Sequence, residues 1–185
     1  MRNYGLLCLF SVWVYGCAGT PYQPGPAAYQ VVKPGSILKL NQELTIPPES
    51  AGVLMQYGKV THYTQTNQWY PICRFEVRDP ADTAQVFQPD EFVVTKVRFE
   101  SQYVAAELPL LAAIGIEFGL FGDRGGGPTA EVMSTSFQLQ SQTQPKVWRL
   151  ICQHWEDPKD SRHLTLAEIQ QAVGGIIEFR LTPAP

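Results

Sequence analysis

Short matches to catalytic motifs occur at several places in the chain, and their surroundings argue against each of them. Ser36 and Lys39 have the spacing of the S-x-x-K motif, in which a serine nucleophile opens a helix beside a lysine. Here the pair opens a segment with strand character, and the companion motifs S-D-N and K-T-G are absent from the sequence. Gly52, Gly58 and Lys59 match part of a phosphate-binding loop, but Val60 occupies the position where Ser or Thr must hold magnesium. The sequence therefore predicts no catalytic residue.

Metal-binding side chains gather in one short segment near the C-terminus. Two of the three histidines, His154 and His163, lie within ten residues of each other, and three acidic residues lie between them: Glu156, Asp157 and Asp160. Such a group can bind a metal ion weakly, but the same composition is typical of a solvated surface loop. The sequence favours the loop, and we expect neither a metal nor a cofactor.

The first sixteen residues have the composition of a secretory signal. Arg2 provides the positive start, and an apolar stretch of about a dozen residues follows it. The stretch is too short for a membrane-spanning helix, which needs about twenty apolar residues. We therefore expect residues 1–16 to be a signal peptide that is removed after export, although a chain that stays in the cytosol or is anchored by this segment is an alternative.

The end of this leader, Val14-Tyr15-Gly16-Cys17, resembles the lipobox of bacterial lipoproteins. The resemblance covers only residues 1–17, and Tyr15 departs from it because that position is usually small or β-branched. It implies cleavage before Cys17, which would then carry a diacylglycerol on sulfur and an acyl chain on nitrogen. Two or more acyl chains give stable anchoring, so the implied partner is a membrane. Ala18 follows the cysteine where inner-membrane lipoproteins of enterobacteria carry aspartate, which implies the outer membrane. Ordinary secretion with a chance cysteine is the alternative.

Composition limits the class of protein. The net charge of the full chain is −3, and loss of Arg2 with the leader takes it to −4. Because the sequence is mildly acidic and has no basic stripe, we expect no nucleic-acid binding. Fifteen prolines and fifteen glycines, with only 17% charged residues, are typical of a turn-rich β protein.

Two cysteines remain after the leader and Cys17 are set aside. In the first cysteine segment, alternation puts Cys73, Phe75 and Val77 on one face and Ile72, Arg74 and Glu76 on the other. In the second, Trp148, Leu150 and Cys152 share one face, opposite Val147, Arg149, Ile151 and Gln153. Both cysteines therefore lie on the more apolar face of their segment, so they could meet across a core. An even pair in an oxidising compartment predicts a disulfide. Its loop of 78 intervening residues would be worth roughly 4–5 kcal/mol in the chain-entropy model. Two free buried cysteines, or a reactive pair, are the alternatives.

The remaining chain predicts one mainly β domain. Residues 17–30 are rich in proline and glycine and predict a lipidated N-terminus with an irregular tether. Residues 31–185 predict a single periplasmic domain, an antiparallel sandwich or barrel of about eight strands. The expected strands lie within residues 31–46, 52–57, 60–65, 69–77, 92–99, 130–144, 146–155 and 176–181. Residues 81–90 predict a loop. Thr165 and Glu168 have the spacing of a capping box, which predicts one short C-terminal helix over residues 166–173.

Residues 104–128 are the least regular stretch. Residues 108–121 are almost uncharged and are followed by three consecutive glycines. They could form an insertion folded over the core, a mobile loop, or an exposed apolar surface that meets a partner. For the third alternative, the candidate interaction residues are Leu110, Leu111, Phe118, Leu120 and Phe121.

Several short segments of the domain resemble small proteobacterial envelope lipoproteins to which no activity is assigned. They are residues 34–40, 46–47, 53–56, 73–76 and 164–169. The resemblance supports the domain boundaries and implies no catalytic residue. Our leading hypothesis is a non-catalytic outer-membrane lipoprotein that faces the periplasm and has a structural or accessory role with an envelope protein partner. The alternatives are a module that binds a small apolar ligand or lipid inside a barrel, and a hydrolase of unrecognised type.

Overall fold

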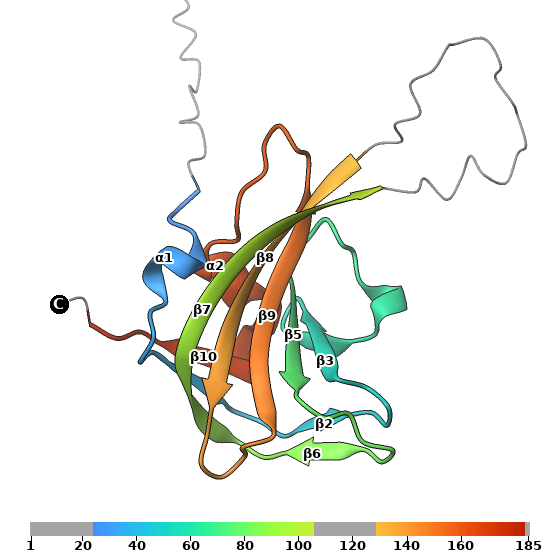
Figure 1. The fold of residues 1–185 in the computed structure, drawn as a ribbon, viewed down its shortest axis with the longest axis vertical. Coiled ribbons are helices and arrows are strands. Elements are labelled where there is room, and N and C mark those ends of the chain that lie inside the picture. The colour runs from blue at the N-terminus through green and yellow to red at the C-terminus, as the bar shows by residue number, and fades with distance from the viewer. Residues whose placement is uncertain (1–23, 106–128, 184–185) are drawn as a thin grey trace, which may run out of the picture.

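The computed structural model describes residues 24–105 and 129–183, and it consists mainly of one curled antiparallel sheet (Figure 1). Side by side, the eight strands of this sheet are β10 (Ile177–Arg180), β1 (Ile37–Leu40), β7 (Asp90–Ala105), β8 (Thr129–Gln140), β9 (Val147–Glu156), β5 (Ile72–Val77), β3 (Gly52–Gln56) and β4 (Lys59–Thr61). Every neighbouring pair is antiparallel. The expected class, a mainly β antiparallel fold with about eight strands and a short C-terminal helix, is confirmed. The sheet curls into a half-barrel instead of forming a sandwich of two large layers.

A second, smaller sheet is formed by two segments for which the sequence predicted other structures. Strands β2 (Leu44–Ile46) and β6 (Gln85–Phe87) pair with each other. The strand expected within residues 31–46 is therefore two strands that belong to different sheets, and the segment 81–90 is not entirely a loop. Leu44, Ile46 and Phe87 are buried, so tertiary packing stabilises strands too short to be recognised from their pattern.

The concave side of the half-barrel is filled with side chains. Helix α2 (Leu166–Val173) lies behind the sheet in Figure 1 and buries Ile169, Ala172 and Val173 against it. Thr165 Oγ1 accepts a hydrogen bond from the Glu168 main-chain N–H, and the Glu168 carboxylate accepts one from the Thr165 N–H, so the predicted capping box is confirmed. The largest completely buried side chains of this core include Phe75, Phe92, Phe137, Leu38, Leu40, Met55 and Leu150.

The folded domain begins earlier in the chain than the sequence indicated. Of the tether expected over residues 17–30, the part from residue 24 onward is described, and it is not all irregular. Ala27 forms a β-bridge with Thr165, and the short helix α1 (Ala28–Val31) follows. Ala28 is completely buried and its N–H donates to the Leu164 carbonyl at 2.8 Å. Ala27 and Ala28, which precede the expected start of the domain at residue 31, therefore pack with it.

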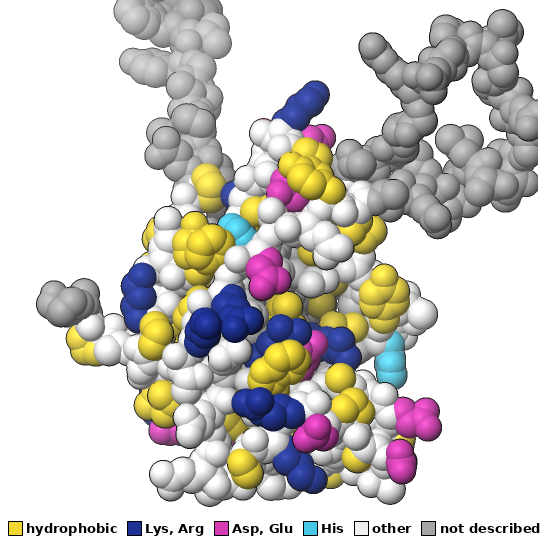
Figure 2. Space-filling model, viewed as in Figure 1, with side chains coloured by type: hydrophobic (Ala, Val, Ile, Leu, Met, Phe, Trp, Pro, Cys, Tyr) yellow, Lys and Arg dark blue, Asp and Glu magenta, His cyan; other side chains and the backbone are white. Residues whose placement is uncertain are grey.

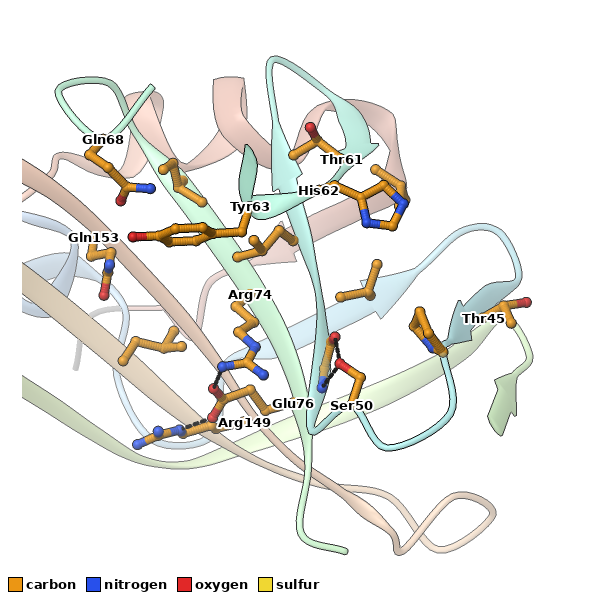
Figure 3. A pocket seen from close by; sticks show the side chains of 17 residues that line it. Thr45, Ser50, Thr61, His62, Tyr63, Gln68, Arg74, Glu76, Arg149 and Gln153 are labelled. Carbon is orange, nitrogen blue, oxygen red and sulfur yellow. Dashed lines mark hydrogen bonds and ion pairs between the residues drawn. The ribbon is translucent and has the colours of Figure 1, made fainter. Parts of the chain in front are cut away.

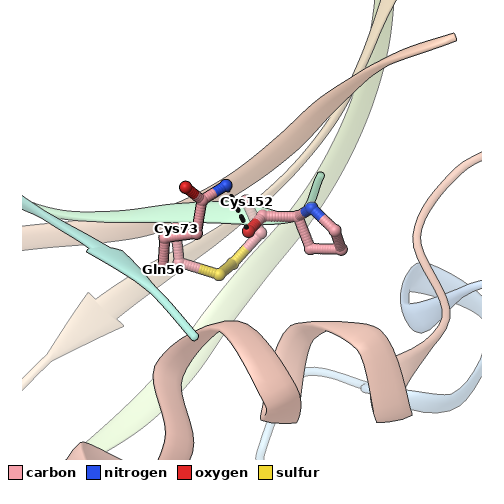
Figure 4. The surroundings of a disulfide bond; sticks show 4 residues. Gln56, Cys73 and Cys152 are labelled. Atoms are coloured by element: carbon pink, nitrogen blue, oxygen red, sulfur yellow. Dashed lines mark hydrogen bonds between the residues drawn. A yellow bond between two sulfur atoms is a disulfide. The ribbon is translucent and has the colours of Figure 1, made fainter. Parts of the chain in front are cut away.

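The predicted disulfide joins Cys73 and Cys152, with an S–S distance of 2.10 Å (Figure 4). The sequence predicted that the two cysteines would meet across the core. Instead they face each other on the neighbouring strands β5 and β9. Both are completely buried, and the bond lies on the side of the sheet that α2 covers (Figure 4). The bond therefore links two adjacent strands at the centre of the sheet.

Two predictions fall on residues outside the described ranges. The leader with Cys17 is one, and the candidate interaction residues Leu110, Leu111, Phe118, Leu120 and Phe121 are the other. Within residues 24–105 and 129–183, no helix has the length and apolar character needed to cross a membrane.

Candidate binding groove on the outer face of the sheet

The candidate site is a groove on the convex face of the sheet, and its floor comes from two strands whose faces the sequence predicted. Ile72, Arg74 and Glu76 were expected to share one face of the first cysteine strand, and Arg149, Ile151 and Gln153 one face of the second. Strands β5 and β9 pair so that Ile72 faces Gln153, Arg74 faces Ile151 and Glu76 faces Arg149. Because the disulfide fixes the opposite side of the same two strands, these six side chains form one continuous outer surface.

A β-bulge in β9 changes the face of two neighbouring residues. The register passes from the pair Glu76 and Arg149 to the pair Val77 and Val147, so Trp148 has no partner on β5. The sequence placed Trp148 inside and Val147 outside, but Val147 is buried and Trp148 is only partly buried. The strict alternation used for the prediction fails here because a bulge adds one residue to one strand.

The charged centre of the groove is a carboxylate held between two guanidinium groups. The side chain of Glu76 is only 7% exposed. Arg149 Nε contacts one carboxylate oxygen at 2.6 Å, and Arg74 Nη1 contacts the other at 3.3 Å. The Arg149 guanidinium also lies 4.0 Å from the centre of the Trp148 ring, a cation–π contact that limits its motion. Two positive charges and one negative charge leave this centre with a net charge of +1.

The wall of the groove comes from the segment that follows β3. The β3–β4 hairpin continues into the 3₁₀ helix η1 (Tyr63–Gln65), and Tyr63 points across the groove toward Gln153 (Figure 3). Gln56, which is buried, donates to the Asn67 carbonyl at 2.9 Å and accepts from the Asn67 N–H at 3.0 Å. These bonds hold the segment that carries Tyr63 against the end of β3.

The groove has a volume of about 720 Å³. Apolar side chains and polar ones share its lining: Pro47, Val53, Leu54, Val60, Ile72 and Ile151 with Thr45, Ser50, Thr61, His62, Tyr63, Gln68, Arg74, Glu76, Arg149 and Gln153. Such a volume falls within the roughly 300–1,000 Å³ typical of small-ligand sites.

A glycine contact fixes the hairpin that borders the groove. Gly58 and Gly174, the residue that ends α2, both have positive φ, at 72° and 55°. A Cβ at Gly174 would lie 2.5 Å from Gly58 Cα, and Gly58 N–H donates to the Ala172 carbonyl at 2.9 Å. The hairpin turn therefore rests directly on the C-terminus of α2, with no room for a side chain between them.

The outer face beside the groove is basic although the whole chain is acidic. Lys96 on β7 lies in one row with Gln138 and Arg149, and Arg98 lies in one row with Ser136 and Ile151. Figure 2 shows Lys and Arg side chains gathered on this face of the sheet. Glu100 lies on the same face, in one row with Ser134 and Gln153. The cations Arg74, Lys96, Arg98 and Arg149 still outnumber Glu76 and Glu100 there, so the local charge is opposite in sign to the net charge of −3.

His62 lines the groove, whereas His154, His163 and the S-x-x-K match at Ser36 lie elsewhere. His154 is buried on the concave side, and its Nε2 lies 2.9 Å from the Arg162 carbonyl. Burial lowers the pKa of His163, and the nearby His154 lowers it further. In the described part of the chain, no three His, Cys, Asp or Glu side chains converge as metal ligands do. Ser36 is buried before β1, where its hydroxyl lies 3.4 Å from the Thr182 hydroxyl.

Comparisons with protein-family models, curated proteins and solved structures found no match to this chain.

Sequence reasoning missed the wall of the groove. Tyr63 lies in the segment 60–65, which the sequence predicted as a strand, but the strand β4 ends at Thr61 and Tyr63 belongs to the 3₁₀ helix η1. Gln68 lies in a polar stretch for which the sequence predicted no face. One signal was present: residues 51–73 contain no Asp or Glu, and four of their aromatic residues are at least half exposed in the structure, namely Tyr57, Tyr63, Trp69 and Tyr70. Exposed aromatic side chains without acidic neighbours are typical of contact surfaces.

Proposed function

We propose that this protein is a non-catalytic lipoprotein of the bacterial cell envelope, held at the outer membrane through Cys17, with an accessory role in an envelope assembly. The residues Val14-Tyr15-Gly16-Cys17 support the anchor. The Cys73–Cys152 bond supports an oxidising compartment. In this proposal the groove on the outer face is the surface that receives a segment of another envelope protein.

The observation that carries the proposal is the state of the charged groups in the groove. Glu76 is buried between Arg74 and Arg149, and the shorter of the two contacts measures 2.6 Å. Charged side chains that already form ion pairs lose little conformational entropy when a ligand binds, and this favours binding. The groove is also lined by a mixture of apolar and polar groups, as protein interfaces are.

A second candidate function is the binding of a small apolar ligand or lipid. We expected such a ligand inside a closed barrel, but buried core residues fill the concave side of the sheet. The outer groove, with a volume of about 720 Å³, is large enough for such a ligand. In this alternative the ligand binds on the outer face of the sheet.

Labelling with palmitate tests the anchor. Cells that express the wild-type chain should incorporate labelled palmitate into the protein, and cells that express Cys17→Ala should not. Cys8→Ala is the matched control, because that cysteine lies within the expected leader. Equal labelling of wild type and Cys17→Ala would refute lipidation.

Site-specific photo-crosslinking in living cells tests the groove. A photoreactive amino acid at Tyr63 should give a discrete crosslinked product that is absent when the same amino acid replaces Lys159, on the exposed turn after β9. Adding Ile151→Glu, which puts an acidic group into the floor of the groove, should abolish this product. Identical products from both positions, or none from Tyr63, would refute the groove as the contact surface.

A further inference from the structure

The groove contains one positive charge that its own carboxylate does not neutralise. Arg74 and Arg149 are 39% and 27% exposed at their side chains, and Glu76 is the one acidic residue among the described residues that line the groove. A guanidinium has five N–H donors, and the hydrogen bonds and ion pairs described above occupy few of them. Both arginines line the groove, so their remaining exposed donors are available to an occupant.

From this arrangement we propose that the groove recognises an extended peptide segment of a partner protein that carries a carboxylate beside apolar side chains. The carboxylate contacts Arg74 and Arg149, and the apolar side chains pack on Leu54, Ile72 and Ile151. This inference rests on the proposed function, because it names the chemistry of the segment that the accessory role requires.

The polar lining favours a peptide over a fatty acid. Thr61, Gln68 and Gln153 carry donors and acceptors that line the groove. A hydrocarbon chain would remove water from these groups without replacing their hydrogen bonds, which disfavours binding. Main-chain amides of a peptide can satisfy them.

The groove floor lies on the inner strands β5 and β9, but one border of the groove reaches the sheet edge, and this border favours an extended conformation. Val60 and Thr61 belong to β4, which is the last strand in the order of the sheet. An edge strand leaves main-chain groups without a strand partner, and extended peptides commonly add to such edges.

Selection from a random decapeptide phage library tests the inference. The purified protein should enrich peptides that carry Asp or Glu next to Val, Ile or Leu. Arg74→Gln should lower the affinity of the best peptide by roughly tenfold or more, because a charge-assisted hydrogen bond is lost. Arg98→Gln is the matched control: it is the same substitution on the same outer face, outside the groove, and it should change affinity by less than about twofold.

Two further measurements make the result decisive. Arg74→Gln keeps the 2.6 Å contact between Arg149 and Glu76, so an unchanged melting temperature shows that the effect belongs to binding. Octanoate should not displace the best peptide at concentrations near the affinity of that peptide. Displacement by octanoate would identify a small apolar carboxylate as the occupant and overturn the peptide proposal.

The failures of the two proposals are distinguishable. If Tyr63 crosslinks in cells but the selected peptides lack acidic residues, or bind Arg74→Gln equally well, the accessory role stands and this inference is wrong. A library that yields no enriched peptide also overturns it. If Tyr63 gives no crosslink, the proposed function fails whatever the library selects.

Discussion

Glu76 is the residue on which the groove depends, because it combines burial with charge. A carboxylate with 7% exposure requires compensation, since a buried charge without a partner is expensive. Arg74 and Arg149 both compensate the negative charge of Glu76, but to different extents. Arg149 is nearer and is also held by the Trp148 ring, whereas Arg74 is farther away and more exposed.

This inequality predicts different costs for removing each arginine. Arg149→Ala should lower the free energy of unfolding by about 2 kcal/mol, less than a fully buried pair because Arg74 remains. Arg74→Ala should cost about 0.5 kcal/mol, because Arg74 is partly exposed and lies farther from the carboxylate, at 3.3 Å. Urea unfolding followed by circular dichroism measures both, with Arg98→Ala as the control on the same face. Equal costs for Arg149→Ala and Arg74→Ala would contradict the geometry.

Glu168 is the residue whose ionisation makes folding depend on pH. Burial would raise the pKa of this carboxyl, but hydrogen bonds from Arg162 and Thr165 outweigh burial and lower it from 4.5 to about 2. Because the pKa of the folded state is the lower one, the stabilisation is complete above about pH 5 and is lost as the pH falls toward 2.

Acid unfolding of Glu168→Gln checks this dependence. At pH 7 the variant should be less stable than wild type by roughly 1–2 kcal/mol, a figure reduced for the partial exposure of the group. The difference between the two proteins should shrink as the pH falls from 5 to 2. Glu178→Gln, whose carboxylate lies in an exposed ion pair with Arg180, is the control. A constant difference across this pH range would show that Glu168 acts by some means other than its charge.

At the scale of elements, the groove exists because the β3–β4 hairpin is supported from behind by α2. The turn of the hairpin and the end of the helix meet through Gly58 and Gly174, and a Cβ on Gly174 would lie 2.5 Å from the Gly58 backbone. Both glycines have positive φ, which L-residues with side chains adopt at a cost. A change at this contact should therefore move the wall of the groove as well as destabilise the fold.

Two adjacent glycines provide a matched test of this contact. Gly174→Ala should lower the free energy of unfolding by about 2 kcal/mol or more, since it combines a backbone clash with a strained φ. Gly175→Ala meets no atom within 4 Å and should change stability by less than about 0.5 kcal/mol. Thermal unfolding compares the two variants. Equal destabilisation by both would mean that the hairpin does not rest on the helix terminus.

At the scale of the whole molecule, one covalent bond joins strands that are distant in the chain. Cys73 and Cys152 are 79 residues apart in sequence, and they hold together the two strands that form the floor of the groove. Breaking the bond should therefore affect the stability of the whole domain and not only its edge.

Removal of either cysteine measures the contribution of this bond. Cys73→Ser should lower the free energy of unfolding by about 2–5 kcal/mol, and Cys152→Ser should give a similar loss. Reduction of the wild-type protein with dithiothreitol should reproduce the effect and should slow its migration on a denaturing gel. The double variant should not respond to dithiothreitol. If dithiothreitol changes neither the stability nor the gel migration of the wild-type protein, the disulfide bond is refuted.

Part of the fold was predictable because local patterns decide it. The strands around Cys73 and Cys152 alternate along their own residues, and the capping box of α2 involves only Thr165 and Glu168. The groove floor follows from the same alternation, since Arg74, Glu76 and Arg149 were assigned to outer faces from their positions alone. Such features depend on neighbours within a few residues, and these are visible in the sequence.

Only the tertiary structure could decide the remaining features. The bulge at Trp148 and the small sheet of β2 and β6 arise because distant strands must fit together. The wall that carries Tyr63 takes its place through Gln56 and through the contact of Gly58 with Gly174.

The sequence by itself determined the β class, the pairing of Cys73 with Cys152 and the outward direction of the groove residues, because periodicity and residue type encode them locally. The tertiary structure alone decided that the two cysteines are cross-strand neighbours, that the concave side is filled and that the groove lies on the convex side. Strand order and curl are set by the sum of many long-range contacts, and no short stretch of the chain encodes that sum.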